Sequence, residues 1–85
     1  MSVTKKEISR EDMVDKFIAV ANELAVTESK ERIGAALMFA ASRYNAYEAS
    51  TKTENLAIHR GDAVGWYTKE YQRMLNANLD EMMGI

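Results

Sequence analysis

The chain has 85 residues, no cysteine and a formal net charge of -2 at pH 7. A chain of this length buries only about 60% of its unfolded surface, which is enough for one core and not for two. The absence of cysteine excludes disulfides, thiolate metal sites and thiol nucleophiles, so we expect a cytoplasmic protein that is stabilised by packing alone.

The charge pattern and the apolar runs exclude two kinds of partner. The 11 basic residues are outnumbered by 13 acidic ones and are scattered, whereas duplex nucleic acid requires a clustered positive face. No run reaches the roughly 18 apolar residues of a membrane span, and the N-terminus has no apolar signal segment. We therefore expect no nucleic-acid partner and no membrane association.

The first predicted helix covers residues 9–26, and helix is favoured throughout because the sequence contains no proline. Ser9 is the expected N-cap, with Asp12 three residues later in a Ser-x-x-Asp arrangement. The apolar residues of this segment recur at helical spacing and gather on one face, which consists of Met13, Phe17, Val20, Ala21 and Leu24. We expect the helix to end near Val26.

The second predicted helix covers residues 29–50 and contains the most apolar run of the chain. Its main stripe consists of Ile33, Ala36, Leu37, Ala40, Tyr44 and Tyr47. The opposite face carries small side chains, which are Ala35, Ser42, Ala46 and Ala49. Alanine is the best helix former, so these residues are explained by propensity alone, and they equally suit a second surface on which another helix packs.

The third predicted helix covers residues 54–83, with Thr53 as its N-cap and Gly84 at its end. Gly61 and Gly65 interrupt it at a cost near 1 kcal/mol each relative to alanine, which favours a kink or fraying there. Its apolar stripe is longer than the first two helices can cover. A homodimer is a natural way to bury the excess, which includes Tyr71, Met74, Leu75 and Met82.

A candidate partner-binding surface lies outside this apolar stripe. His59, Trp66 and Arg73 are spaced by seven residues and share one flank of the third helix. Tryptophan beside arginine is a composition enriched at protein interfaces. The alternative is that Trp66 lies at the edge of the core with its indole N–H in water, and the sequence leaves both interpretations open.

A second candidate site lies on the second helix. Arg43 and Asn45 interrupt its apolar run, and together with Tyr44 and Tyr47 they are candidates to line a small-ligand pocket. The more ordinary role of such polar side chains is structural: they form hydrogen bonds or ion pairs inside the protein. An exposed Arg43 paired with a carboxylate favours the interaction surface, and one aimed into a cavity favours the pocket.

No motif in the sequence predicts catalysis, a metal site or a cofactor site. His59 and Asp62 have the i, i+3 spacing of a metal pair, but a site needs three or four ligands. Phosphate-binding loops and nucleophile elbows are absent. We therefore expect neither an enzyme nor a bound cofactor.

Several blocks resemble a known family, the small proteobacterial proteins of domain of unknown function 3144. The resemblance is carried by Asp15-Lys16-Phe17-Ile18 with Ala21-Asn22, by the block from Ala35 to Ala46, and by Tyr67, Tyr71, Met74-Leu75 and Asn78-Leu79-Asp80. It implies a soluble, cytoplasmic, helical bacterial protein, and it supplies no functional residues. Gly61, Gly65 and Ala77 depart from the pattern of the family, which puts the straightness of the third helix in doubt.

These observations predict an all-α fold over residues 1–85, a single domain in the form of a three-helix bundle with a long C-terminal helix. The expected function is that of a small non-catalytic module for protein–protein interaction or regulation. It presents to another protein either the flank with His59, Trp66 and Arg73 or the alanine face of the second helix. The alternative function is that of a bundle with a small-ligand pocket near Arg43.

Overall fold

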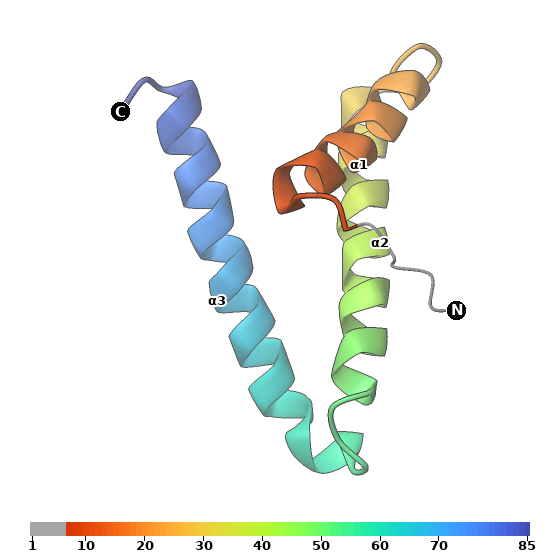
Figure 1. The fold of residues 1–85 in the computed structure, drawn as a ribbon, viewed down its shortest axis with the longest axis vertical. Coiled ribbons are helices and arrows are strands. Elements are labelled where there is room, and N and C mark those ends of the chain that lie inside the picture. The colour runs from red at the N-terminus through yellow and green to blue at the C-terminus, as the bar shows by residue number, and fades with distance from the viewer. Residues whose placement is uncertain (1–6) are drawn as a thin grey trace, which may run out of the picture. The chain divides into compact units, whose positions relative to one another are not determined.

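A computed structural model describes residues 7–85, and within them the chain forms three helices and no strand (Figure 1). The helices are α1 (Arg10–Leu24), α2 (Lys30–Ser50) and α3 (Leu56–Met82). The predicted all-α fold with a long C-terminal helix is therefore confirmed. In the described part of the chain, no helix is long and apolar enough to cross a membrane. The prediction that the N-terminus has no apolar signal segment concerns, in part, residues 1–6. These lie outside the described residues.

The chain divides into two compact units, the first ending at Ala40 and the second running from Ala41 to Ile85. The boundary falls inside α2. The first unit therefore contains α1 and the beginning of α2, and the second contains the end of α2 and the whole of α3. That residues 1–85 form a single domain stays a prediction.

Side-chain caps define the helix starts of the first unit. Oγ of Ser9 accepts a hydrogen bond of 3.0 Å from the backbone N–H of Asp12, which confirms the predicted N-cap of α1. Oγ of Ser29 accepts one of 3.2 Å from the N–H of Arg32, so α2 begins at Lys30. Each cap satisfies one of the amide donors that the first turn of a helix leaves without a partner.

The end of α1 lies at Leu24, two residues before the predicted end. The amides of Val26 and Thr27 donate to carbonyls three residues back, at 3.3 and 3.1 Å, which tightens the chain into turns instead of continuing the helix. Half-buried residues gather on both sides of this connection, at Ala21 and Ile33.

The start of α3 differs from the prediction, which placed the N-cap at Thr53 and the helix start at residue 54. The N-cap is Asn55, whose Oδ1 accepts a hydrogen bond of 3.2 Å from the N–H of Ile58. Oγ1 of Thr53 instead accepts from the N–H of Asn55 at 3.0 Å and so closes the turn before the helix. The prediction was wrong because both residues are good caps and only the turn decides between them.

α3 continues as an unbroken helix through Gly61 and Gly65, so the fraying expected there is wrong. The helix ends at Met82, one residue before the predicted end, and Gly84 follows its C-cap as predicted. Gly84 has a positive φ of 76°, which glycine adopts without steric cost. Its N–H donates to the carbonyl of Glu81 at 3.1 Å, and the N–H of Ile85 donates to the carbonyl of Asp80 at 2.9 Å. This pair of bonds is a Schellman motif, which satisfies carbonyls at the end of the helix.

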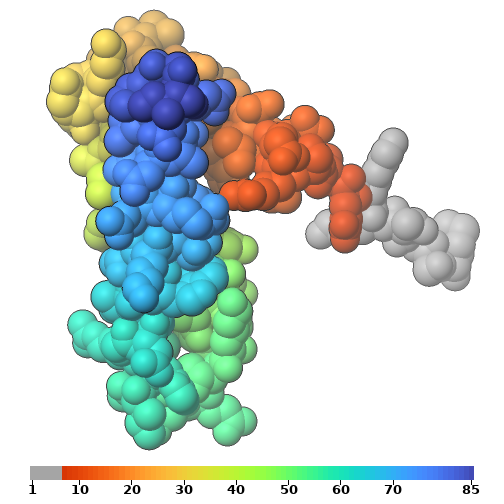
Figure 2. Space-filling view, turned by 90° about the vertical axis from the view of Figure 1, so that its left-hand side faces the viewer, coloured from red at the N-terminus to blue at the C-terminus, as the bar shows by residue number. Residues whose placement is uncertain are grey.

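Within the second unit, the end of α2 and the start of α3 lie against each other, as the green and cyan surfaces show (Figure 2). The half-buried side chains of this unit lie on the two facing surfaces. They are Asn45, Glu48, Ala49 and Thr53 from α2 and the residues that follow it, and Ala63, Tyr67 and Glu70 from α3. The alanine on each side allows the two backbones to approach closely. The small-residue face of α2 was explained either by helix propensity or as a contact surface. The position of Ala49 fits a contact surface.

Candidate functional site

A single carboxylate, that of Glu48, joins α2 to α3. The hydroxyl of Tyr67 donates a hydrogen bond of 2.8 Å to Oε1 of Glu48, between residues that are 19 positions apart. Nδ2 of Asn45 donates to the same oxygen at 3.3 Å, and Nζ of Lys52 lies 3.7 Å from Oε2. Three donors therefore surround Glu48, and the donor from Tyr67 is the one that reaches it from α3.

These contacts displace two pKa values in opposite directions. The hydrogen bond from Tyr67 lowers the pKa of Glu48, with help from Asn45 and Lys52 and against the effect of partial burial. Removal from water raises the pKa of Tyr67, and the hydrogen bond to the Glu48 carboxylate raises it further. Around neutral pH, the pair is therefore an ionised glutamate that accepts from a neutral tyrosine.

Trp66 lies against the ring of Tyr67. The two ring centroids are 5.0 Å apart and the ring planes are inclined by 89°, an edge-to-face arrangement that aromatic pairs favour. Trp66 nevertheless remains 60% exposed. The indole is thus presented to solvent beside a tyrosine whose hydroxyl is anchored on the neighbouring helix.

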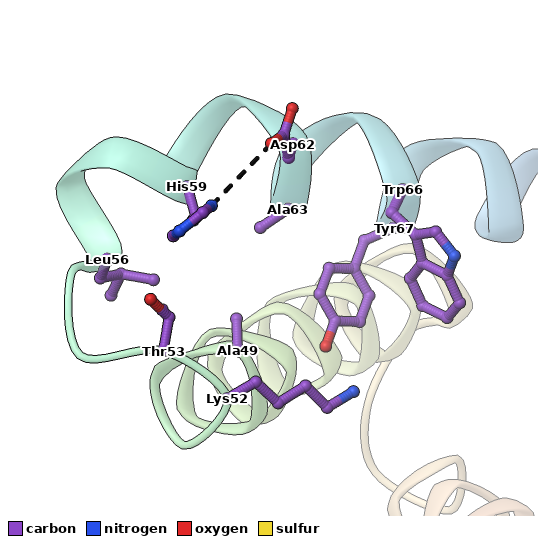
Figure 3. A pocket seen from close by; sticks show the side chains of 9 residues that line it. All are labelled: Ala49, Lys52, Thr53, Leu56, His59, Asp62, Ala63, Trp66 and Tyr67. Atoms are coloured by element: carbon purple, nitrogen blue, oxygen red, sulfur yellow. Dashed lines mark ion pairs between the residues drawn. The ribbon is translucent and has the colours of Figure 1, made fainter.

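An open groove of about 530 Å³ lies between the end of α2 and the start of α3 (Figure 3). It is lined by apolar, aromatic and polar side chains, which are Ala49, Lys52, Thr53, Leu56, His59, Asp62, Ala63, Trp66 and Tyr67. Figure 3 shows Ala63 and Tyr67 projecting from α3 towards α2, with Trp66 beside Tyr67 at one end. The carboxylate of Asp62 lies on the outer side of α3, where its side chain is 92% exposed.

The structure brings two of the three residues of the predicted partner surface to this groove. His59 and Trp66 line it, and Nδ1 of His59 lies 4.0 Å from Oδ2 of Asp62, an ion pair when the histidine is protonated. Arg73 lies two turns beyond Trp66 along α3. Its guanidinium donates to the carboxylate of Glu70 at 2.9 and 3.3 Å, which holds it on the same flank of the helix.

The residues of the alternative ligand site do not line this groove. Tyr44 and Tyr47 are exposed and contact each other, with ring centroids 5.8 Å apart at an interplanar angle of 60°. Asn45 is half-buried and bonded to Glu48, and Arg43 is exposed. Asn45 therefore has the internal structural role that the sequence analysis favoured for it. The small-ligand pocket stays a prediction.

Sequence reasoning did not identify Glu48, Lys52 or Tyr67 as residues of a joint site. A signal was present, because Asn45, Glu48 and Lys52 are spaced by three and four residues and so form a polar row along one face of a helix. Tyr67 was placed on the apolar stripe of α3, and its hydroxyl needs a partner when the ring is partly buried. Nothing in the spacing connects that tyrosine to that row.

Within residues 7–85 there is no group of three or more histidines, aspartates and glutamates that could hold a metal ion. The His59 and Asp62 pair therefore has no third ligand of these types nearby. The donors around the groove are an ammonium, an imidazole, an indole N–H and hydroxyls, and these groups suit recognition by hydrogen bonds and apolar contact.

The comparison with protein families agrees with the resemblance found in the sequence. A family model with the description "Protein of unknown function (DUF3144)" matches residues 11–83. No curated protein and no solved structure matches the chain. The matched range contains the whole of α2 and α3, and with them Glu48, Trp66, Tyr67 and the groove. Because the match covers most of its length, the chain belongs to the DUF3144 family of proteins of unknown function.

Proposed function

We propose that this chain is a small non-catalytic module that binds another protein through the Trp66 face, which we define as His59, Trp66 and Arg73 together with the adjoining groove. The proposal rests on one observation, the exposure of the only tryptophan of the chain beside an open groove between α2 and α3. The partner is a protein that remains to be identified, and the net charge of -2 favours a protein over a nucleic acid.

The position of Trp66 around α3 supports this proposal. Successive residues of a helix are about 100° apart, so Trp66 lies roughly 60° to 100° from Ala63 and Tyr67, the half-buried residues that face α2. It lies roughly 140° to 180° from the far edge of the apolar stripe, which consists of Val64, Tyr71, Leu75 and Met82. Trp66 is therefore at the rim of the contact between α2 and α3, where it lines the groove and stays 60% exposed.

The chemistry of the Trp66 face suits a binding anchor. Tryptophan and arginine are enriched among residues that dominate binding energy, because each offers a large contact area together with a hydrogen-bond donor. Arg73 is held by Glu70, so its guanidinium is ordered before a partner arrives. The small side chains of Ala49 and Ala63 leave room in the groove beside the indole.

The pKa shifts support a non-catalytic role. General acids and bases work best when their pKa lies near the operating pH. The pKa of Glu48 is lowered and that of Tyr67 is raised, so both move away from neutrality. Such a pair stabilises a contact between helices and exchanges protons poorly at neutral pH. As the resemblance implies, we place this module in the bacterial cytoplasm.

Self-association into a homodimer stays part of the proposal. Within the second unit, α2 covers the apolar stripe of α3 only at Ala63 and Tyr67, whereas Val64 is 57% and Met82 is 85% exposed. A second copy that packs on the exposed edge of the stripe leaves the Trp66 face free, because that edge lies roughly 140° to 180° from Trp66 around α3. Sedimentation that shows only monomer at high micromolar concentration removes the homodimer without affecting the Trp66 face.

The experiment that tests the function is affinity capture from a lysate of the host that makes the protein. Three baits are compared, namely the wild type, the double variant Trp66→Ala, Arg73→Ala, and the control Tyr44→Ala. Tyr44 is a suitable control because it is an equally exposed aromatic residue, at 66%, that lies outside the groove.

We expect a discrete protein that the wild type and the control retain and the double variant loses. Circular dichroism of all three baits shows whether the fold is intact. A partner that binds the folded double variant as well as the wild type contradicts the proposal, and so does the absence of any captured protein.

A further inference from the structure

We propose that Glu48, acting through Tyr67, is a positioning residue that holds the indole of Trp66 in the orientation in which it is presented to solvent. The biological purpose of this positioning rests on the proposed function, since a residue that anchors a partner benefits from being ordered before the partner binds. The positioning itself concerns only contacts inside residues 41–85 and can be measured without any partner.

The first step is the anchoring of Tyr67 at both ends. Its backbone belongs to α3, and its hydroxyl donates the 2.8 Å hydrogen bond to Glu48 on α2. A hydrogen bond to an ionised acceptor is shorter and stronger than one between neutral groups. The ring of Tyr67 therefore has little freedom to change its χ1 rotamer while this bond persists.

The second step is the anchoring of Glu48. Its side chain would otherwise be mobile, because a glutamate on a helix surface has three rotatable bonds. Here Asn45 reaches Oε1 at 3.3 Å from one turn before, and Lys52 lies 3.7 Å from Oε2 one turn later. The acceptor is thus held from both directions along the chain while Tyr67 approaches it from α3.

The third step transfers this order to Trp66. The indole and the Tyr67 ring are perpendicular, with centroids 5.0 Å apart, so each ring limits the rotation of the other. The side chain of Trp66 is 60% exposed, which leaves Tyr67 as its principal aromatic contact. An ordered indole loses less conformational entropy on binding than a mobile one, which favours tight binding.

The test uses Trp66 as its own reporter, because it is the only tryptophan of the chain. The order parameter of its indole N–H is measured by nuclear magnetic resonance in the full chain. In Tyr67→Phe, which keeps the ring and removes the hydroxyl, we expect it to fall below the wild-type value by an amount comparable to the difference between rigid and flexible backbone amides, about 0.85 against 0.6. The matched control is Tyr71→Phe, which removes a tyrosine hydroxyl from the same helix away from Trp66, and should leave the order parameter unchanged.

A pair of variants at Glu48 keeps the test decisive if Tyr67→Phe does not fold. Glu48→Gln retains an oxygen that accepts from the tyrosine, so we expect the order parameter to stay near that of the wild type. Glu48→Ala removes the acceptor and should lower it as Tyr67→Phe does. A role of Glu48 that depends only on its negative charge does not predict this rescue by glutamine.

Unchanged order in folded Tyr67→Phe, or equal order in the two Glu48 variants, overturns the positioning. The outcome is separable from that of the proposed function. If the order parameter responds as stated and the folded double variant Trp66→Ala, Arg73→Ala captures the same proteins as the wild type, the positioning holds and the binding role fails. If the capture succeeds and the order parameter does not respond, the binding role holds and the positioning fails.

Discussion

The hydroxyl of Tyr67 on α3 donates a hydrogen bond of 2.8 Å to the carboxylate of Glu48 on α2. This contact joins two helices that also face each other through the small side chains of Ala49 and Ala63, and it does so next to the exposed Trp66. The same bond therefore bears on the stability of the second unit and on the presentation of the indole. Both consequences can be measured.

The bond makes stability depend on pH at both ends of the scale. Because the folded pKa of Glu48 lies below its ordinary value of 4.5, its contribution is fully present above that value and is lost as the pH falls through the lowered pKa. Because the folded pKa of Tyr67 lies above 10.0, its contribution is present below that value and is lost as the pH rises through the raised pKa.

The measurement is urea unfolding of the wild type and of Tyr67→Phe over a range of pH. We expect the wild type to be the more stable protein between these limits, and we expect the difference to shrink in strong acid and in strong alkali. A difference that stays constant across the whole range contradicts the pKa shifts.

The exposure of Trp66 predicts the fluorescence of the native protein. An indole that is 60% exposed should emit at the long wavelengths typical of tryptophan in water and should be quenched readily by acrylamide. Because Trp66 is the only tryptophan, the signal needs no assignment. Blue-shifted emission that acrylamide quenches only after unfolding shows a buried indole and refutes the account.

The N-cap of α1 predicts the effect of a single hydroxyl. Ser9→Ala removes the oxygen that accepts from the N–H of Asp12 at 3.0 Å, and we expect the free energy of unfolding to fall by about 1 kcal/mol. The control is Ser9→Asp, which keeps an acceptor at the same place and should stay close to the wild type. Equal stability of the alanine and aspartate variants in urea unfolding would show that the cap contributes nothing.

The glycines of α3 predict effects of opposite sign. A Cβ at Gly61 or Gly65 meets no other atom within 4 Å, so alanine at either position should raise the free energy of unfolding by roughly 0.5 to 1 kcal/mol through helix propensity. Gly84→Ala should lower it by about 1 kcal/mol, because φ is 76° there. Thermal unfolding of the three variants checks the signs, and a loss of stability in Gly61→Ala speaks against a continuous helix.

The sequence predicted those features of the fold that depend on local interactions. The N-cap at Ser9 follows from a side chain and an amide three residues apart, and the end of α3 before Gly84 follows from the freedom of glycine at positive φ. The start of α3 was misplaced because Thr53 and Asn55 both suit a cap. Local propensity does not distinguish two candidate caps that are two positions apart when the turn between them decides.

The candidate site was predicted only in part, for a related reason. The alignment of His59, Trp66 and Arg73 on one flank is a property of a single helix, so spacing alone indicated it. The exposure of Trp66 and its contact with Tyr67 depend on where α2 lies beside α3, and spacing does not determine that. The bond between Glu48 and Tyr67 joins residues 19 positions apart, and neither residue carries a motif that points to the other.

The central claim is that Trp66 touches a partner protein, and site-specific photo-crosslinking in the host tests it most directly. A photoreactive phenylalanine analogue is placed at position 62, in the groove one turn before an intact Trp66, in one strain and at the exposed position 44 outside the groove in another. The account predicts a discrete crosslinked adduct of higher mass from position 62 and none of that mass from position 44. No adduct from position 62, or the same adduct from both positions, contradicts it.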